Sequence, residues 1–92
     1  MPRIDILVPK FIHYMPEKSL MEEGMLYISR EFEVAIHKCC CGCGQETVMP
    51  FGTHGWTLTE QDGKVTFSPS IGNFQIPCRS HYWIKDNRVI WC

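Results

Sequence analysis

The chain has 92 residues, and its 9 Lys and Arg against 10 Asp and Glu give a formal net charge of -1. Because domains usually span about 100–150 residues, this length fits one small domain, residues 1–92, and excludes a two-domain enzyme or a barrel of about 200 residues. A hydrophobic share of 45% is typical of a globular chain, and the lack of a basic excess predicts no nucleic-acid partner.

The N-terminal segment lacks the features of a secretion signal. Its longest apolar stretch, residues 6–8, ends at Pro9, whereas a signal peptide needs an apolar core of about 7–15 residues. No apolar stretch reaches the roughly 18 residues of a membrane span. We therefore expect a cytoplasmic protein that has no membrane association and keeps its cysteines reduced. The alternative is an exported protein that has lost its leader.

The first half of the chain predicts short strands and one short helix. Strands are expected over residues 3–8, 25–29 and 32–37, and the last two are close enough to pair as a hairpin. Residues 17–23, EKSLMEE, are the one stretch with helical character, and a glycine follows them.

The second half predicts two hairpins. The first joins strands 56–60 and 65–68 through Asp62-Gly63, a pair that favours the positive φ angles of a two-residue turn. The second joins strands 82–84 and 89–92. The predicted fold is all-β, or α+β with one short helix: about seven short strands, mostly antiparallel.

The sharpest local motif is HKCCCGCG, at residues 37–44. In an extended chain its alternate positions share one face: His37, Cys39, Cys41 and Cys43. At about 3.3 Å per residue, positions 37 and 43 would lie about 20 Å apart, which one ion with bonds of about 2.3 Å cannot bridge. If these thiols are to converge, the chain must turn, and its two glycines allow a turn at low cost.

A second group of metal-ligand types follows 35 residues later, in the C-x-x-H pair of Cys78 and His81. Zinc prefers four sulfur or nitrogen ligands, so two thiolates from residues 39–43 together with this pair would complete a site that pins two hairpins together. The candidate ligands of this predicted zinc are Cys39, Cys41, Cys43, Cys78 and His81. The alternatives are buried unligated thiols, or disulfides in an oxidising compartment.

Two segments, SPSIGNF and SHYW, carry the residue types of a serine hydrolase. A serine nucleophile needs a base within hydrogen-bond reach, and Ser70 or Ser80 could pair with His81, His37 or His54. Ser70 is the favoured nucleophile because the Pro and Gly around it predict a tight loop. Serine and asparagine also populate turns for structural reasons, and a His81 that bound zinc could not act as a base.

These motifs together resemble those of the bacterial proteins grouped as domain-of-unknown-function family 6527. The resemblance covers residues 25–91 and rests on HKCCCGCG, SPSIGNF and CRSHYWI; Phe74 stands where the family more often has Trp, and Cys40 is extra to the motif. It implies a small metal-binding β protein. Some members lie beside bacterial ubiquitin-like proteins and their activating and conjugating enzymes, which implies a peptidase acting on the ubiquitin-like tail.

Two functions therefore remain open. One is a zinc-binding peptidase or hydrolase that processes a ubiquitin-like protein; the other is a non-catalytic, zinc-stapled adaptor for a protein partner. A Ser–His contact of about 2.6–3.2 Å beside a cleft would favour the enzyme. A closed zinc site that includes His81, with serines confined to turns, would favour the adaptor.

Overall fold

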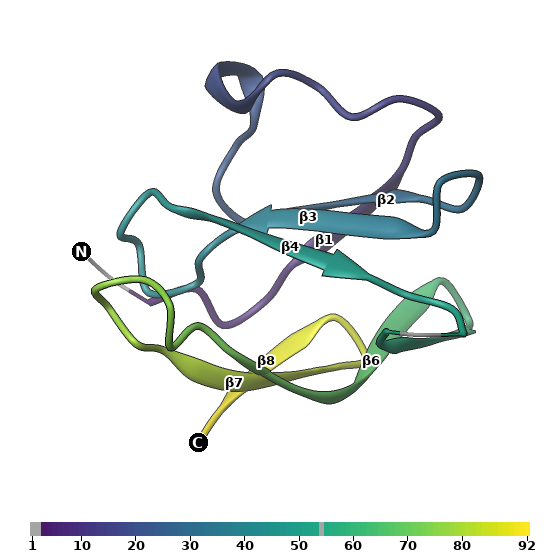
Figure 1. Ribbon diagram of the computed structural model, residues 1–92. Helices are drawn as coiled ribbons and strands as arrows, with labels where there is room; N and C mark the ends of the chain where they lie inside the picture. Colours follow the sequence, from purple (N-terminus) through teal and green to yellow (C-terminus); the bar gives the residue numbers. More distant parts are fainter. Residues whose placement is uncertain (1–2, 54) are drawn as a thin grey trace.

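The computed structural model describes residues 3–53 and 55–92, which form two four-stranded sheets (Figure 1). The strands of the first sheet, in order, are β1 (Val8–Phe11), β2 (Met25–Ser29), β3 (Val34–Lys38) and β4 (Glu46–Pro50). Those of the second are β5 (Thr57–Gln61), β6 (Lys64–Gly72), β7 (His81–Lys85) and β8 (Arg88–Trp91). Neighbouring strands are antiparallel except β1 and β2, which are parallel. The all-β prediction is confirmed.

The three predicted hairpins are present as β2–β3, β5–β6 and β7–β8. At the turn of β5–β6, Asp62 and Gly63 have φ angles of 53° and 77°, and at the turn of β7–β8, Asp86 and Asn87 have 49° and 68°. These positive angles give the chain the twist that two-residue hairpins require. The turn chemistry of the sequence therefore predicts these hairpins correctly.

Three elements differ from the sequence-based expectation. The strand expected at residues 3–8 begins only at Val8, and Ile6 forms an isolated bridge. The predicted helix is a single 3-10 turn, η1 (Lys18–Leu20), which buries none of its own residues: Leu20 is 67% exposed, and an isolated turn without a buried face has little to extend it. Strand β4 was not predicted. It lies at the edge of its sheet, where its terminal proline is tolerated.

Within the described residues, no helix has the length and apolar character needed to cross a membrane.

One hydrophobic cluster includes inward-facing side chains of both sheets. Leu26 and Ile28 of the first sheet are fully buried, as are Phe67 and Ile84 of the second. Along β7 the alternation is regular, since Tyr82 and Ile84 are buried while the residues between and after them are exposed. Burial of two inner faces against each other stabilises the sheets as a packed pair.

The second sheet is irregular where it approaches the predicted catalytic segment. Strand β6 has nine residues, but β5 pairs only with its first five, Lys64–Ser68. The pairing of β6 with β7 shifts in register between Phe67 and Ile71. Among the described residues, the last part of β6 therefore has a neighbouring strand on the β7 side alone.

We expect Ile84→Ala to lower the free energy of unfolding by about 2–5 kcal/mol, because it removes methylene and methyl groups from a fully buried site. The matched control is Ile90→Ala on the neighbouring strand, where the side chain is 47% exposed and the loss should be under about 1 kcal/mol. Denaturant unfolding of both variants measures the difference. Equal losses would show that the inner face of β7 has been assigned wrongly.

Candidate functional site

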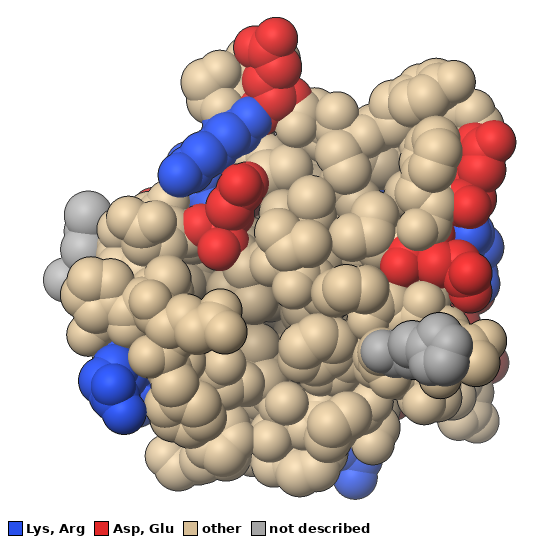
Figure 2. All heavy atoms as spheres, viewed as in Figure 1, with Lys and Arg blue, Asp and Glu red and all other residues tan. Residues whose placement is uncertain are grey.

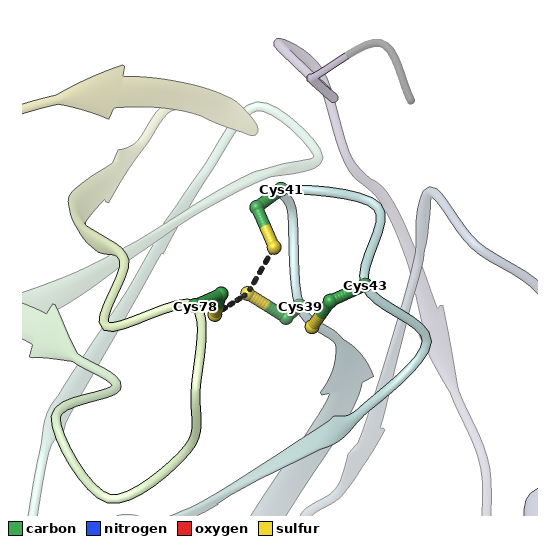
Figure 3. A group of neighbouring side chains, drawn as sticks. All are labelled: Cys39, Cys41, Cys43 and Cys78. Carbon is green, nitrogen blue, oxygen red and sulfur yellow. Dashed lines mark hydrogen bonds between the residues drawn. The ribbon is translucent and has the colours of Figure 1, made fainter.

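Four cysteine sulfurs converge where the loop after β3 meets the loop before β7 (Figure 3). The Sγ atoms of Cys39, Cys41, Cys43 and Cys78 all lie within 4.8 Å of one another. Cys39 Sγ is 3.5 Å from the sulfur of Cys41 and 3.6 Å from that of Cys78. A tetrahedral zinc ion with bonds of about 2.3 Å holds its sulfur ligands about 3.8 Å apart. The four side chains, which we call the thiol cluster, therefore fit such an ion in both donor type and spacing.

The loop after β3 brings three of these thiols together by turning sharply. The Cys39 N–H donates to Gln45 O at 2.7 Å, and the Gly42 N–H donates back to Cys39 O at 3.1 Å. Gly42 and Gly44 have φ angles of 89° and 84°, a left-handed conformation that is costly for other residues. The prediction that the glycines of this motif turn the chain is confirmed.

The other cysteines lie apart from the thiol cluster. Cys40 lies between the alternate positions of the motif and points to the opposite face. It is buried in the core, and burial raises the pKa of its thiol to about 12. Cys92 is exposed at the end of the chain. His81, which the sequence offered as a fifth ligand, is not a member of the cluster. The spacing of the motifs alone could not choose four ligands among five candidates.

Within the thiol cluster, one sulfur is stabilised as a thiolate. Burial raises the pKa of the thiols of Cys39 and Cys41. Burial also opposes ionisation of Cys78, but hydrogen bonds from the side chain and backbone of Ser80 and from the two other thiols outweigh it and lower the pKa of Cys78 to about 6. Negative charge is thus favoured at Cys78, and a bound cation would favour ionisation of the other thiols as well.

A polar network supports the thiol cluster from the protein interior. Ser80 Oγ lies 2.9 Å from Cys39 Sγ and accepts a hydrogen bond of 2.9 Å from Asn73 Nδ2. The Thr47 hydroxyl of β4 donates to Asn73 Oδ1 at 3.0 Å, and the Asn73 N–H donates to Ser80 O at 2.7 Å. Ser80, one of the two candidate nucleophiles, therefore has its hydroxyl against a cysteine sulfur.

His37, another candidate base, is fully buried against a tyrosine. Its Nε2 lies 2.6 Å from Tyr82 OH, and burial lowers the pKa of His37 to about 4, so the ring is neutral at pH 7. Its contacts identify it as a core residue of β3. His54, the remaining candidate, lies outside the described residues.

Ser70 and His81 form a hydrogen-bonded pair: Ser70 Oγ lies 2.8 Å from His81 Nε2. Ser70 belongs to the last part of β6, and His81 is the first residue of β7. The expectation of a tight loop at Ser70 is wrong, because this segment continues β6 through the register shift and pairs Gly72 with His81. The two side chains thus meet across adjacent strands.

The surroundings of this pair hold the imidazole and leave space beside it. The ring of Phe74 meets the His81 ring edge-on, with centroids 5.4 Å apart, and so restricts its rotation. Phe74 also lines a pocket of about 410 Å³, together with Ile71 and Gly72, so the pair reaches this pocket through Phe74 and does not line it directly. When Nδ1 carries the ring proton, Nε2 accepts the Ser70 proton, which is the arrangement of a nucleophile with its general base.

A serine hydroxyl within hydrogen-bond distance of an imidazole nitrogen is a geometry that serine hydrolases use, and here it occurs on a small all-β scaffold that also carries a candidate metal site. The comparison with protein families agrees with this class. The chain belongs to the BubE family, described as "Bacterial ubiquitination-like system serine protease", whose model matches residues 11–92. No curated protein and no solved structure matches the chain.

We expect protein purified under reducing conditions to carry about one zinc ion per chain, because four reduced thiols at this spacing bind zinc tightly. Cys39→Ser or Cys78→Ser should abolish stoichiometric zinc and lower the melting temperature. Emission spectrometry and thermal unfolding measure the two effects.

The matched controls are cysteines outside the thiol cluster. Cys92→Ser, at the exposed end of the chain, should keep the zinc and change stability by under about 1 kcal/mol. Cys40→Ala should lose stability through the cavity it leaves in the core, yet retain the ion. Full zinc content in Cys78→Ser, or loss of zinc in Cys40→Ala, would contradict the ligand assignment.

Proposed function

We propose that the protein is a serine peptidase that processes a ubiquitin-like protein, with Ser70 as the nucleophile and His81 as the general base. The observation that carries this proposal is the distance of 2.8 Å between Ser70 Oγ and His81 Nε2. The description of the family supports the reaction class, and its bacterial ubiquitination-like system supports a ubiquitin-like protein or a conjugation enzyme as the partner. The finer family assignment from the motifs, domain-of-unknown-function family 6527, stays a prediction.

The proposed reaction follows from the chemistry of this pair. His81 Nε2 takes the hydroxyl proton as Ser70 Oγ attacks the carbonyl carbon of the substrate, and the carbonyl oxygen becomes an oxyanion. Collapse of this intermediate breaks the C–N bond, and His81 gives its proton to the leaving amine. Water then attacks the resulting ester with His81 again as the base, which releases the acid and restores Ser70.

The thiol cluster has a structural role in this proposal. Four protein thiolates would complete the coordination of one zinc ion, and a bound ion would contribute folding energy rather than an open position for chemistry. It would tie the loop after β3 to Cys78, three residues before His81. The position of His81 outside the cluster favours the enzyme over the adaptor, since the imidazole is available to Ser70.

Ser70→Ala should lower the rate of cleavage by about 10⁴-fold or more, because the covalent route needs the hydroxyl. His81→Gln should cause a loss of similar size, since the serine then lacks its base. The substrate is the ubiquitin-like protein of the same bacterial system with a C-terminal extension, and mass spectrometry follows its cleavage. Both variants should keep their zinc, because neither side chain belongs to the thiol cluster.

Ser68→Ala is the matched control, as Ser68 is an exposed serine on the same strand. It should cleave at the parental rate. Labelling with a small fluorophosphonate, which reacts with activated serines, should modify Ser70 in the parent and not in Ser70→Ala. Parental cleavage by Ser70→Ala would overturn the assignment of Ser70 as the nucleophile. Loss of zinc in His81→Gln would show that His81 is a metal ligand.

A further inference from the structure

The outer edge of β4 has backbone groups that no strand of the described residues pairs. The Cys39 N–H bonds to Gln45 O, so this opposed pair of residues is hydrogen-bonded. Along an antiparallel ladder, pairs that exchange backbone hydrogen bonds alternate with pairs that do not. Counting from Gln45, Glu46 and Val48 therefore form no backbone hydrogen bonds with β3. Their N–H and C=O groups therefore point away from the sheet. In the described part of the chain, no backbone or side-chain group hydrogen-bonds to them there.

The last part of β6 presents a second unpaired edge. The Asn73 N–H bonds to Ser80 O, so the next opposed pair, Gly72 and His81, is non-bonded. The backbone of Gly72 consequently points away from β7, to the side where the pairing with β5 has already ended at Ser68. A side chain at position 72 would collide with the Phe74 ring, so the glycine keeps this backbone open.

The two edges line the same pocket. Its walls include Glu46 and Val48 of β4, and Gly72 with the segment that follows β6. The apolar part of its lining consists of Val48, Trp56, Ile71, Phe74 and Ile76. In the view of Figure 2, the surface around β4 and β6 is mostly uncharged.

Strand β5 occupies the space between β4 and β6 at the other end of the pocket. At the other end of β4, Pro50 O accepts a hydrogen bond of 2.9 Å from the Trp56 N–H, so the chain entering β5 pairs with β4 there. From Thr57 onward β5 then pairs with β6. Before Trp56 the chain turns away through Gly55, and the position between the two edges receives no strand from the described residues.

We propose that this pocket, which we call the strand gap, binds an extended segment of the protein substrate as an added strand between β4 and the end of β6. This inference rests on the proposed function, because the substrate backbone would pair with Gly72, two residues from Ser70 along β6. An extended peptide has backbone N–H and C=O groups that need hydrogen-bond partners. The outward backbone groups of Glu46 and Val48 on one side, and of Gly72 on the other, would supply them. Alternate side chains of the segment would enter the apolar lining.

The strand gap also limits the kind of substrate. A segment that bonds to both edges must have both of its own edges unpaired, which excludes a helix, a hairpin or a strand within a folded sheet. A flexible chain terminus or an interdomain linker meets this condition. The occupant is therefore an unstructured tail with small or apolar residues, and a folded ubiquitin-like body would remain outside the strand gap.

Hydrogen exchange on the Ser70→Ala variant tests the binding without any need for cleavage. The probe is a peptide of the last dozen or so residues of the ubiquitin-like protein of the same bacterial system. At saturation, NMR should show exchange of the Val48 and Gly72 amides slowed at least tenfold. The Glu60 amide, which points outward on β5, should be unchanged. The same peptide N-methylated at alternate residues keeps its side chains and should lose both binding and protection.

A proline variant tests the same inference through kinetics. Val48→Pro removes one outward N–H on an edge strand, where proline is tolerated, and should raise the KM for the peptide at least tenfold. Fluorophosphonate labelling of Ser70 should be unchanged, since that reagent is too small to need strand pairing. Glu60→Pro makes the same change on the edge of β5 and should leave KM unchanged.

The outcomes separate this inference from the proposed function. Protection of Val48 and Gly72 in Ser70→Ala, with no cleavage by the parent, would support the strand gap and overturn the peptidase. Cleavage with a parental KM in Val48→Pro, or binding without protection of these amides, would overturn the strand gap and leave the peptidase standing. A peptide that neither binds nor is cleaved would count against both.

Discussion

The convergence of two loops on four sulfur atoms is the contact that fixes the rest of the site. Cys39 is the central member, since its sulfur contacts those of Cys41 and Cys78 and also the hydroxyl of Ser80. Through these contacts the loop after β3 is held against the loop that precedes β7. In a domain of this size a metal at such a point would supply a large share of the folding energy and would hold Cys78, three residues before β7, in place.

The side chains of Ser80, His81 and Tyr82, where the chain enters β7, point alternately to two sites. Ser80 is buried and turns toward the thiol cluster, whereas His81 is half-buried and faces Ser70 on the outer surface. Tyr82 turns inward again, to His37. Ser80 belongs to the interior network and the next residue, His81, belongs to the Ser70–His81 pair, because successive side chains of an extended chain point to opposite faces.

Asn73 links the interior network to the outer pair. Its side chain joins Thr47 of β4 to Ser80, while its backbone N–H bonds to Ser80 O and so sets the register in which Gly72 opposes His81. The strand gap lies directly beside this point. The thiol cluster, the proposed catalytic pair and the proposed path of the substrate thus depend on the same few backbone contacts between β6 and β7.

The sequence by itself determined the features that arise from local chemistry. The Asp-Gly turn predicted its hairpin because two adjacent positive φ angles suit few other residues. The glycines of the cysteine motif predicted a sharp turn. The place of Cys40 between the alternate positions predicted that it would point away from the other three cysteines of the motif. The residue types of the site were likewise visible, since thiols, serines and histidines stand in two compact motifs.

Only the tertiary structure decided how those residues are shared. Cys78 and His81 have the spacing of a ligand pair, yet Cys78 joins the thiol cluster and the His81 ring bonds to Ser70. That outcome depends on the register shift between β6 and β7 and on contacts between segments more than 30 residues apart, which no local pattern encodes. The strand gap has the same origin. Which edges of β4 and β6 remain unpaired follows from where β5 ends and how the two sheets meet, and not from any motif.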